Sequence, residues 1–358
     1  MEKLVSCLGV ILLLSCGDEE VFYEKGDYDK VPKIDTHIHV STNRDAFVQQ
    51  AQNDNFKLLN IVVDLSKGKE FLEEEYRYRL EQKTRHPDDY EFATTFSIEE
   101  WDHPNWLNNT LSWLDKNINE GAIAVKIWKN VGMVFRDSTG QLVMVDDPKL
   151  DTIFKFLTKR KIPVVGHLGE PKNCWLPLEE MSVNNDRVYF EEHPQYHMYK
   201  HPELPSYEDQ IAARDRMLER NPNLIFIGAH MGSLEWSVDE LAKRLDKFPN
   251  MAVDLAARIG QVFSQTIEDR DKVRDFFIKY QDRILYATDL SDNGKAETTH
   301  LKKDMHDTWL LDWQFFVTDD LMNSDRVNQE FRGLKLPKSV VDKIYYGNAK
   351  KWLNMFSN

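Results

Sequence analysis

Four histidines and one aspartate are the side chains of this 358-residue sequence best placed to do chemistry. Each lies at the end of a short apolar run: His37 and His39 in KIDTHIHV, His167 in VVGHLGE, His230 in FIGAHMGS and Asp289 in LYATDLS. Imidazoles and a carboxylate around an open position are the ligands that a catalytic divalent ion uses. A lone histidine at a strand end is more often packed or solvated, but this group at equivalent positions predicts one metal site. Zinc is the first choice for the ion, with manganese as an alternative.

Eight short apolar runs would position these side chains. They occupy residues 33–40, 56–64, 90–97, 122–130, 162–170, 223–233, 251–258 and 284–291, and amphipathic segments with helical periodicity separate most of them. Strands joined through helices pair in parallel, and eight such units close a (β/α)8 TIM barrel; an open doubly wound sheet is the alternative. In a barrel, strands one, five, six and eight direct the five side chains toward one axis at the carboxyl face.

The first 32 residues predict export rather than catalysis. Lys3 and a short apolar run at 8–14 are typical of a signal peptide at 1–15, because the run falls far short of the roughly 18 residues of a spanning helix. The tetrapeptide LLSC resembles a bacterial lipobox, which would lipidate Cys16 and make 16–32 a flexible tether before a catalytic domain at 33–358. We therefore expect an exported, membrane-anchored lipoprotein, at the outer membrane on its periplasmic or outer surface. Cys174 would be the only thiol of the folded domain.

Two segments interrupt the alternation of strands and helices. Residues 171–205 contain five prolines and many aromatic side chains, and residues 292–338 contain the apolar patch WLLDWQFF. We expect both to be long loop insertions, after strands five and eight, that act as lids over the site or as interface covers in a homo-oligomer.

The overall charge restricts the class of partner. The net charge is -14, whereas binding to nucleic acid requires clustered lysine and arginine. We therefore expect a small-molecule substrate and no nucleic-acid partner.

The motifs HIH, VKIW, GHLG, GAHMGS and ATDLS, closing with YGNAKKWL at 346–353, resemble the amidohydrolase superfamily. The resemblance runs from residue 33 to 356 and is to the amidohydrolase-related (family 2) branch of TIM-barrel metal-dependent hydrolases and decarboxylases. It implies that His37, His39, His167 and Asp289 hold the metal and that His230 contacts the substrate or the metal-bound water. Some members carry a carbamylated lysine on the fourth strand that bridges a second metal. The branch mostly uses one ion, so Lys126 is expected to bind substrate or to lie between barrel layers instead.

The same residues predict hydrolysis. A divalent ion lowers the pKa of bound water toward about 7, so a metal-bound hydroxide could attack an amide, lactone or ester carbonyl. Asp289 would act as general base and His230 would stabilise the oxyanion. The alternative for Asp289 is an N-cap of the following helix.

The residues expected to bind substrate lie near the predicted barrel mouth: Lys126, Trp128, Glu170, Arg258 and His197. Arg258 could bind a carboxylate or phosphate, or form a salt bridge to Asp254. Two other functions stay open at this point. A metal-dependent decarboxylase would use Arg258 as a carboxylate clamp, and a non-catalytic surface lipoprotein would bind carbohydrate through its aromatic insertions.

Overall fold

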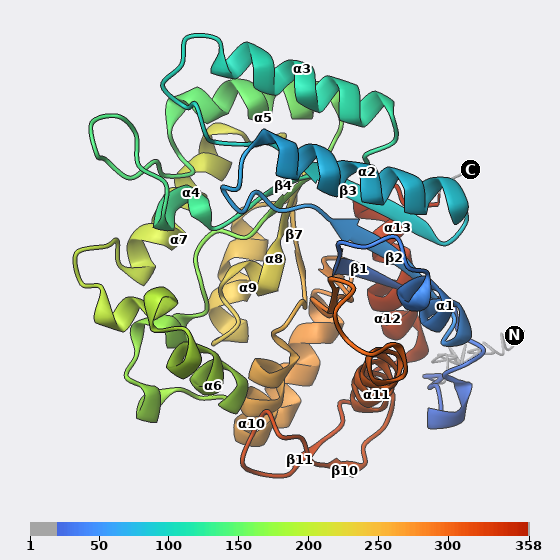
Figure 1. Cartoon of the computed structure of the whole chain (residues 1–358). Coiled ribbons are helices and arrows are strands. Elements are labelled where there is room, and N and C mark those ends of the chain that lie inside the picture. Colours follow the sequence, from blue (N-terminus) through green and yellow to red (C-terminus); the bar gives the residue numbers. More distant parts are fainter. Residues whose placement is uncertain (1–19, 357–358) are drawn as a thin grey trace, which may run out of the picture.

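The computed structural model describes residues 20–356, and these form an α/β fold around one curled parallel sheet of nine strands (Figure 1). The strand order is β8-β7-β6-β5-β4-β3-β2-β1-β9. The strands are β1 (Lys33–Val40), β2 (Phe56–Ile61), β3 (Tyr90–Thr95), β4 (Ala124–Ile127), β5 (Val164–Gly166), β6 (Phe226–Gly228), β7 (Met251–Asp254), β8 (Ile284–Leu285) and β9 (Ser291–Asp292). Each of the eight predicted apolar runs contains a strand.

The run from Ile284 to Asp292 connects the two edges of this sheet. β8 pairs with β7, and β9 pairs with β1. Between them, the backbone N–H of Thr36 donates to the carbonyl oxygen of Tyr286 at 3.0 Å, and the N–H of Asp289 donates to that of His37 at 2.8 Å. One continuous segment therefore bonds to both edges, as in the predicted TIM barrel.

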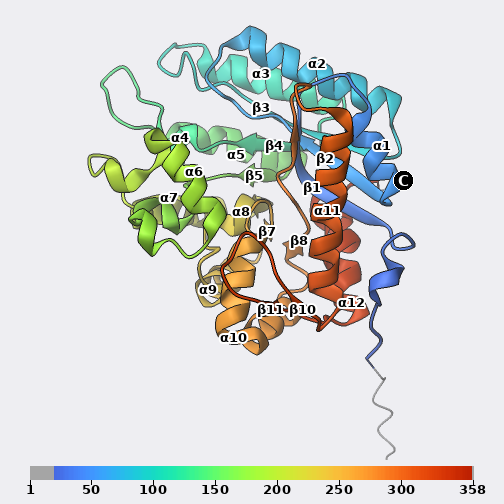
Figure 2. The ribbon, with the colours of Figure 1, turned by 60° about the horizontal axis from the view of Figure 1, so that its bottom comes forward.

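The helices surround the sheet (Figures 1 and 2). They are α1 (Ala46–Asn53), α2 (Lys69–Arg85), α3 (Trp106–Asn119), α4 (Asn130–Met133), α5 (Pro148–Arg160), α6 (Asn184–Glu192), α7 (Tyr207–Arg220), α8 (Ala229–Gly232), α9 (Val238–Lys247), α10 (Ile259–Lys279), α11 (Thr298–Val317), α12 (Lys338–Asp342) and α13 (Asn348–Leu353). Their apolar faces and the outer face of the strands form the large core.

A smaller apolar cluster fills the inside of the curled sheet. Every strand from β1 to β8 contributes to it, and Ala349 and Leu353 of α13 pack against it. His37 and His39 lie further along β1 than its member Ile34. Apolar side chains thus fill the part of the interior near the strand beginnings, while polar side chains gather toward the strand ends.

An irregularity in β1 separates these two layers. Asp35 is paired with Leu58 and Ile38 with Asn60, so β1 has one residue more than β2 across this step. The extra residue reverses the alternation of side chains. Ile34 consequently lies in the inner cluster and Ile38 in the outer core, whereas strict alternation predicts that both isoleucines face outward.

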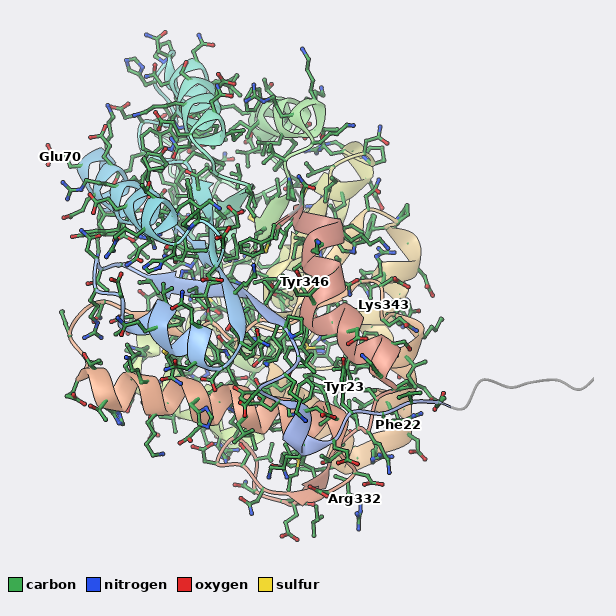
Figure 3. The ribbon with its side chains drawn as sticks, turned by 90° about the vertical axis from the view of Figure 1, so that its right-hand side faces the viewer. Phe22, Tyr23, Glu70, Arg332, Lys343 and Tyr346 are labelled. Carbon is green, nitrogen blue, oxygen red and sulfur yellow. The ribbon has the colours of Figure 1, made fainter. Side chains whose placement is uncertain are left out.

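The described part of the predicted tether, residues 20–32, is packed rather than flexible. Tyr28 and Val31 are buried, and the hydroxyl of Tyr23 donates to Asp342 Oδ1 at 2.6 Å. Figure 3 shows Tyr23 and Phe22 alongside the C-terminal helices. The tether prediction is wrong for these residues because it weighed their acidic groups and overlooked their aromatic side chains. The signal peptide and the lipidation of Cys16 concern residues outside the described range.

The two predicted loop insertions are not confirmed as loops. Residues 171–205 form four 3-10 turns and α6, and residues 292–338 contain the 20-residue helix α11 and a two-stranded antiparallel pair, β10 (Leu321–Met322) and β11 (Phe331–Arg332). The patch WLLDWQFF lies in α11 and contributes Trp309, Trp313, Phe315 and Phe316 to the outer core. None of the helices within residues 20–356 is long and apolar enough to cross a membrane.

Trp309 packs α11 against the strands β1 and β2 of the sheet. Its ring stacks on Phe56 with centroids 4.4 Å apart, and its Nε1 donates to Asp35 Oδ2 at 3.0 Å. The side chain is fully buried. We expect Trp309→Ala to lower the free energy of unfolding by about 3–5 kcal/mol, measured by urea denaturation. Trp352→Ala, at a partly exposed indole on α13, is the matched control and should lower it much less; equal losses would contradict this role of Trp309.

Candidate metal centre

The two histidines of β1 are oriented by hydrogen bonds on the far side of their rings. His37 Nδ1 lies 2.8 Å from Asp254 Oδ2, and His39 Nδ1 lies 2.9 Å from the carbonyl oxygen of Ile61. Both partners only accept hydrogen bonds, so each Nδ1 carries a proton, and in the neutral imidazole each Nε2 has a lone pair for a cation. The two Nε2 atoms face Asp289 Oδ1, at 3.5 Å from His37 and 3.2 Å from His39.

His230 is held in an unusual left-handed turn immediately after β6. Its φ is 59°, and Met231, Gly232 and Ser233 also have positive φ values. Left-handed residues other than glycine are each unfavourable by roughly 1–2 kcal/mol, so surrounding contacts must hold this turn. Asp254 Oδ1 accepts from the His230 N–H at 2.7 Å, and His230 Nδ1 donates to the carbonyl oxygen of Ala256 at 2.9 Å. The free Nε2 of His230 therefore also has a lone pair available for a cation.

Asp289 completes the group. It too has a positive φ, 70°, and its backbone N–H donates to the carbonyl oxygen of His37. Burial disfavours its charged form, but the adjacent imidazoles of His230, His39 and His37 outweigh burial and hold the pKa of this carboxyl well below its usual range. Asp289 is thus an anion in contact with the Nε2 atoms of His37 and His39.

The arrangement fits a divalent ion. One ligand atom each from His37, His230 and Asp289 lies within 4.8 Å of the other two. Burial lowers the pKa of the His37, His167 and His230 imidazoles, which keeps their lone pairs free of protons. His167 Nε2 is buried without a hydrogen-bond partner in the described structure, and its ring centroid is 4.0 Å from that of His230. Two or more imidazoles with a carboxylate suit Zn²⁺ or Mn²⁺.

Lys126 lies beside the same ligand atoms. Its Nζ is 3.3 Å from His37 Nε2, and the side chain is fully buried. Burial lowers the pKa of Lys126 to about 8, although the charges of Asp254 and Asp289 oppose this shift. An amine there can face a substrate oxygen. That Lys126 binds substrate, and that it does not bridge a second metal as a carbamate, both stay predictions.

The residues around His167 form one side of the site. Glu170 Oε2 is 3.6 Å from His167 Nε2, and Glu170 forms a buried ion pair with Lys129. The Lys129 ammonium lies over the ring of Tyr196, 4.8 Å from its centroid, and over that of the half-buried Trp128 at 5.6 Å. Glu170 therefore lies beside His167, and Trp128 lies against Lys129, the ion-pair partner of Glu170; the substrate-binding roles of Glu170 and Trp128 stay predictions.

Arg258 is buried at the start of α10, and within residues 20–356 no carboxylate forms a salt bridge with it. The alternative of a salt bridge to Asp254 is wrong, because Asp254 is bonded to His37 and to the turn at His230. Burial is the largest cause that lowers the pKa of the His167 and His230 imidazoles. The charge of Arg258 is a smaller cause for both, after Lys126 and Lys129 for His167 and after His167 for His230.

His197 is not brought to the site. It is fully buried, its Nε2 donates to the carbonyl oxygen of Leu176 at 2.8 Å, and its ring stacks on Phe190. Nearby, Cys174 Sγ donates to the carbonyl oxygen of Tyr196. Both residues support the small core of the segment after β5, so the predicted substrate-binding role of His197 is wrong.

Sequence reasoning missed Asp254 as a site residue. The run MAVD ends in a buried carboxylate at the end of β7, the same pattern that identified His167 and Asp289. That signal was present and was read only as a partner for Arg258.

Comparison with known proteins agrees with this geometry. The model of the family described as Amidohydrolase matches residues 104–355, more than half of the chain. The chain belongs to this amidohydrolase family. A search of curated proteins finds no match.

Solved structures share the fold of this amidohydrolase. 2,6-Dihydroxybenzoate decarboxylase from Rhizobium has a TM-score of 0.53 at 12% identity, with 91% of this chain and 99% of that chain covered. A structure named as amidohydrolase II has a TM-score of 0.51 at 15% identity, with 90% and 99% covered. 5-Carboxyvanillate decarboxylase from Novosphingobium aromaticivorans, solved with bound manganese, has a TM-score of 0.50 at 11% identity, with 92% and 99% covered.

The unpartnered Nε2 of His167 leads to a prediction about metal affinity. If it contributes to cation binding, His167→Ala should weaken the affinity for Zn²⁺ by at least about tenfold, measured by competition with a chelating dye. His300→Ala, at a histidine whose side chain is 71% exposed, is the matched control and should bind Zn²⁺ as the wild type does. Unchanged affinity in His167→Ala would remove His167 from the ligands.

Proposed function

We propose that this amidohydrolase is a metal-dependent hydrolase that cleaves an amide, lactone or ester bond of a small molecule. The observation that carries the proposal is the convergence of His37, His230 and Asp289, with two oriented imidazoles and an ionised carboxylate, beside the unpartnered nitrogen of His167. The chemistry supplied by a bound divalent ion is Lewis-acid activation of water and of a carbonyl oxygen. We propose Zn²⁺ first, because histidine nitrogen dominates this set.

The side chains divide the remaining tasks. Asp289 can accept a proton from the attacking water at a carboxylate oxygen and return it to the leaving group. His230 donates through Nδ1 to Ala256, so its Nε2 has no proton to offer an oxyanion. This hydrogen bond favours His230 as a ligand rather than in the oxyanion role that the sequence suggests. Lys126, with its ammonium beside the ligand atoms, is better placed to stabilise that negative charge.

A second candidate function is decarboxylation, and Arg258 is the observation that favours it. A buried guanidinium without a carboxylate partner, next to a metal centre, suits a substrate whose carboxylate is lost. Two of the structures with this fold are decarboxylases, which at 11–12% identity shows a shared fold alone.

A substrate screen of the full-length, metal-loaded chain tests the choice. We expect turnover of lactones, amides or esters that stops when a chelator removes the ion and returns when Zn²⁺ is added. Release of carbon dioxide from carboxylated aromatic compounds, without hydrolysis of any carbonyl bond, would overturn the hydrolase and support the second candidate.

A further inference from the structure

Two buried groups of complementary chemistry next to the metal centre fail to contact each other. Arg258 has one hydrogen bond in the described structure, from Nη1 to the carbonyl oxygen of Ala257 at 3.2 Å, and its Nε is buried without a partner. Glu235 is fully buried, and its Oε2 also has no partner. Leaving such groups unpaired is costly, so a further polar group is expected between them.

The protein fixes the other polar groups around these two. Glu235 Oε1 accepts from the backbone N–H of Lys172 at 2.8 Å. Asp186 of α6 accepts from the side-chain amides of Asn173 at 2.9 Å and Gln261 at 2.8 Å. Glu170 is paired with Lys129. The side chains of the neighbouring carboxylates are therefore already engaged, and the free positions belong to Arg258 and to Glu235 Oε2.

We propose that Arg258 and Glu235 together form a subsite, adjacent to the metal centre, that binds a carboxylate group of the substrate. The guanidinium supplies the charge and at least one N–H donor, and Glu235 supplies a second donor from its protonated Oε2. Burial raises the pKa of Glu235 to about 7, although Arg258 and the Lys172 N–H oppose this, so the protonated form is available near neutral pH. The inference rests on the proposed function and specifies its substrate class as a carboxylic acid.

The position of the subsite agrees with this role. Arg258 precedes α10, and Glu235 follows the left-handed turn that carries His230. The backbone just before Arg258 is bonded to the metal centre: the carbonyl oxygen of Ala256 accepts from His230 Nδ1 at 2.9 Å, and the N–H of Ala257 donates to the carbonyl oxygen of Thr288, the residue before Asp289, at 3.1 Å. A ligand held by Arg258 therefore lies next to the groups that would activate water.

Matched pairs of an acid and its amide test the proposal by calorimetry on the full-length, metal-loaded protein. The probes are benzoate with benzamide and phenylacetate with phenylacetamide. We expect at least about tenfold tighter binding of the acids, and at least about a tenfold loss of acid affinity in Arg258→Met with amide affinity unchanged. Arg216→Met, at an arginine whose side chain is 54% exposed, is the matched control and should behave as wild type.

Variants of Glu235 test the donor. Glu235→Gln keeps an N–H donor of nearly the same shape and should retain acid affinity within about threefold, whereas Glu235→Met should lose about tenfold. Equal binding of acids and amides by the wild type, an acid preference that survives in Arg258→Met, or equal losses in both Glu235 variants would overturn the subsite. Thermal unfolding of each variant shows whether it is folded.

Metal analysis of the same samples separates this inference from the proposed function. An acid preference that depends on Arg258 in a protein that binds no divalent ion would support the subsite and refute the hydrolase. A metal-loaded protein that lacks the preference would refute the subsite alone.

Discussion

Replacing Asp289 by asparagine is expected to lower kcat by about 10²–10⁴-fold at saturating metal, because the variant loses the carboxylate that accepts the proton of the attacking water. Asparagine has nearly the same shape, and its backbone N–H can still donate to the carbonyl oxygen of His37. The neutral amide cannot serve as a base, and the loss of the negative charge also weakens the affinity for the metal ion. Steady-state kinetics with the substrate returned by the screen, over a series of Zn²⁺ concentrations, separates these two effects.

Asp271→Asn is the matched control for this change, since the Asp271 side chain is 88% exposed. It should retain wild-type kcat. A kcat for Asp289→Asn within a few-fold of wild type at saturating metal would contradict the assignment of Asp289 as general base.

Asp254→Asn is expected to weaken metal affinity by about 10–100-fold without direct contact between Asp254 and the ion. The Oδ1 atom of Asp254 accepts from the N–H groups of His230 and Ala256, and the amide oxygen of asparagine can keep these bonds. The amide nitrogen then faces His37 Nδ1 and can only donate to it. The proton of His37 would move to Nε2, and the lone pair that faces the metal centre would be lost.

Chelator competition for Zn²⁺ measures this effect. Asp239→Asn, at an exposed carboxylate of α9, should bind Zn²⁺ as the wild type does. Metal affinity of Asp254→Asn within about twofold of wild type would show that the hydrogen bond to His37 does not control its tautomer.

The strands of this fold were predictable from the sequence because each apolar run is short and bounded by polar or turn residues. The gathering of His37, His230 and Asp289 was predictable for the same reason: His230 and Asp289 each end such a run, His37 lies near the end of another, and parallel strands that curl around one axis bring their ends together. The position of Ile34 was not predictable, because the extra residue in β1 is visible only in its pairing with β2.

The spacing of residues along the chain did not determine which side chains face the site and which are buried in a local core; tertiary packing did. Trp309, Trp313 and Phe316 recur at i, i+4 and i+7, a helical spacing that the loop prediction overlooked, and α11 buries them in the outer core. His197 is of a residue type that often binds ligands, but the carbonyl oxygen of Leu176 and the ring of Phe190 hold its side chain in a local core. Whether a polar side chain faces a site or a local core depends on contacts between distant segments, which spacing along the chain does not specify.

Metal content of the purified full-length protein tests the central claim most directly. After incubation with Zn²⁺ or Mn²⁺ and removal of free ion, elemental analysis should find about one equivalent per chain in the wild type and in the exposed-site control His300→Ala, and little in His37→Ala. Less than about half an equivalent in the wild type with either ion, or full occupancy in His37→Ala, would contradict a metal centre built on His37, His230 and Asp289.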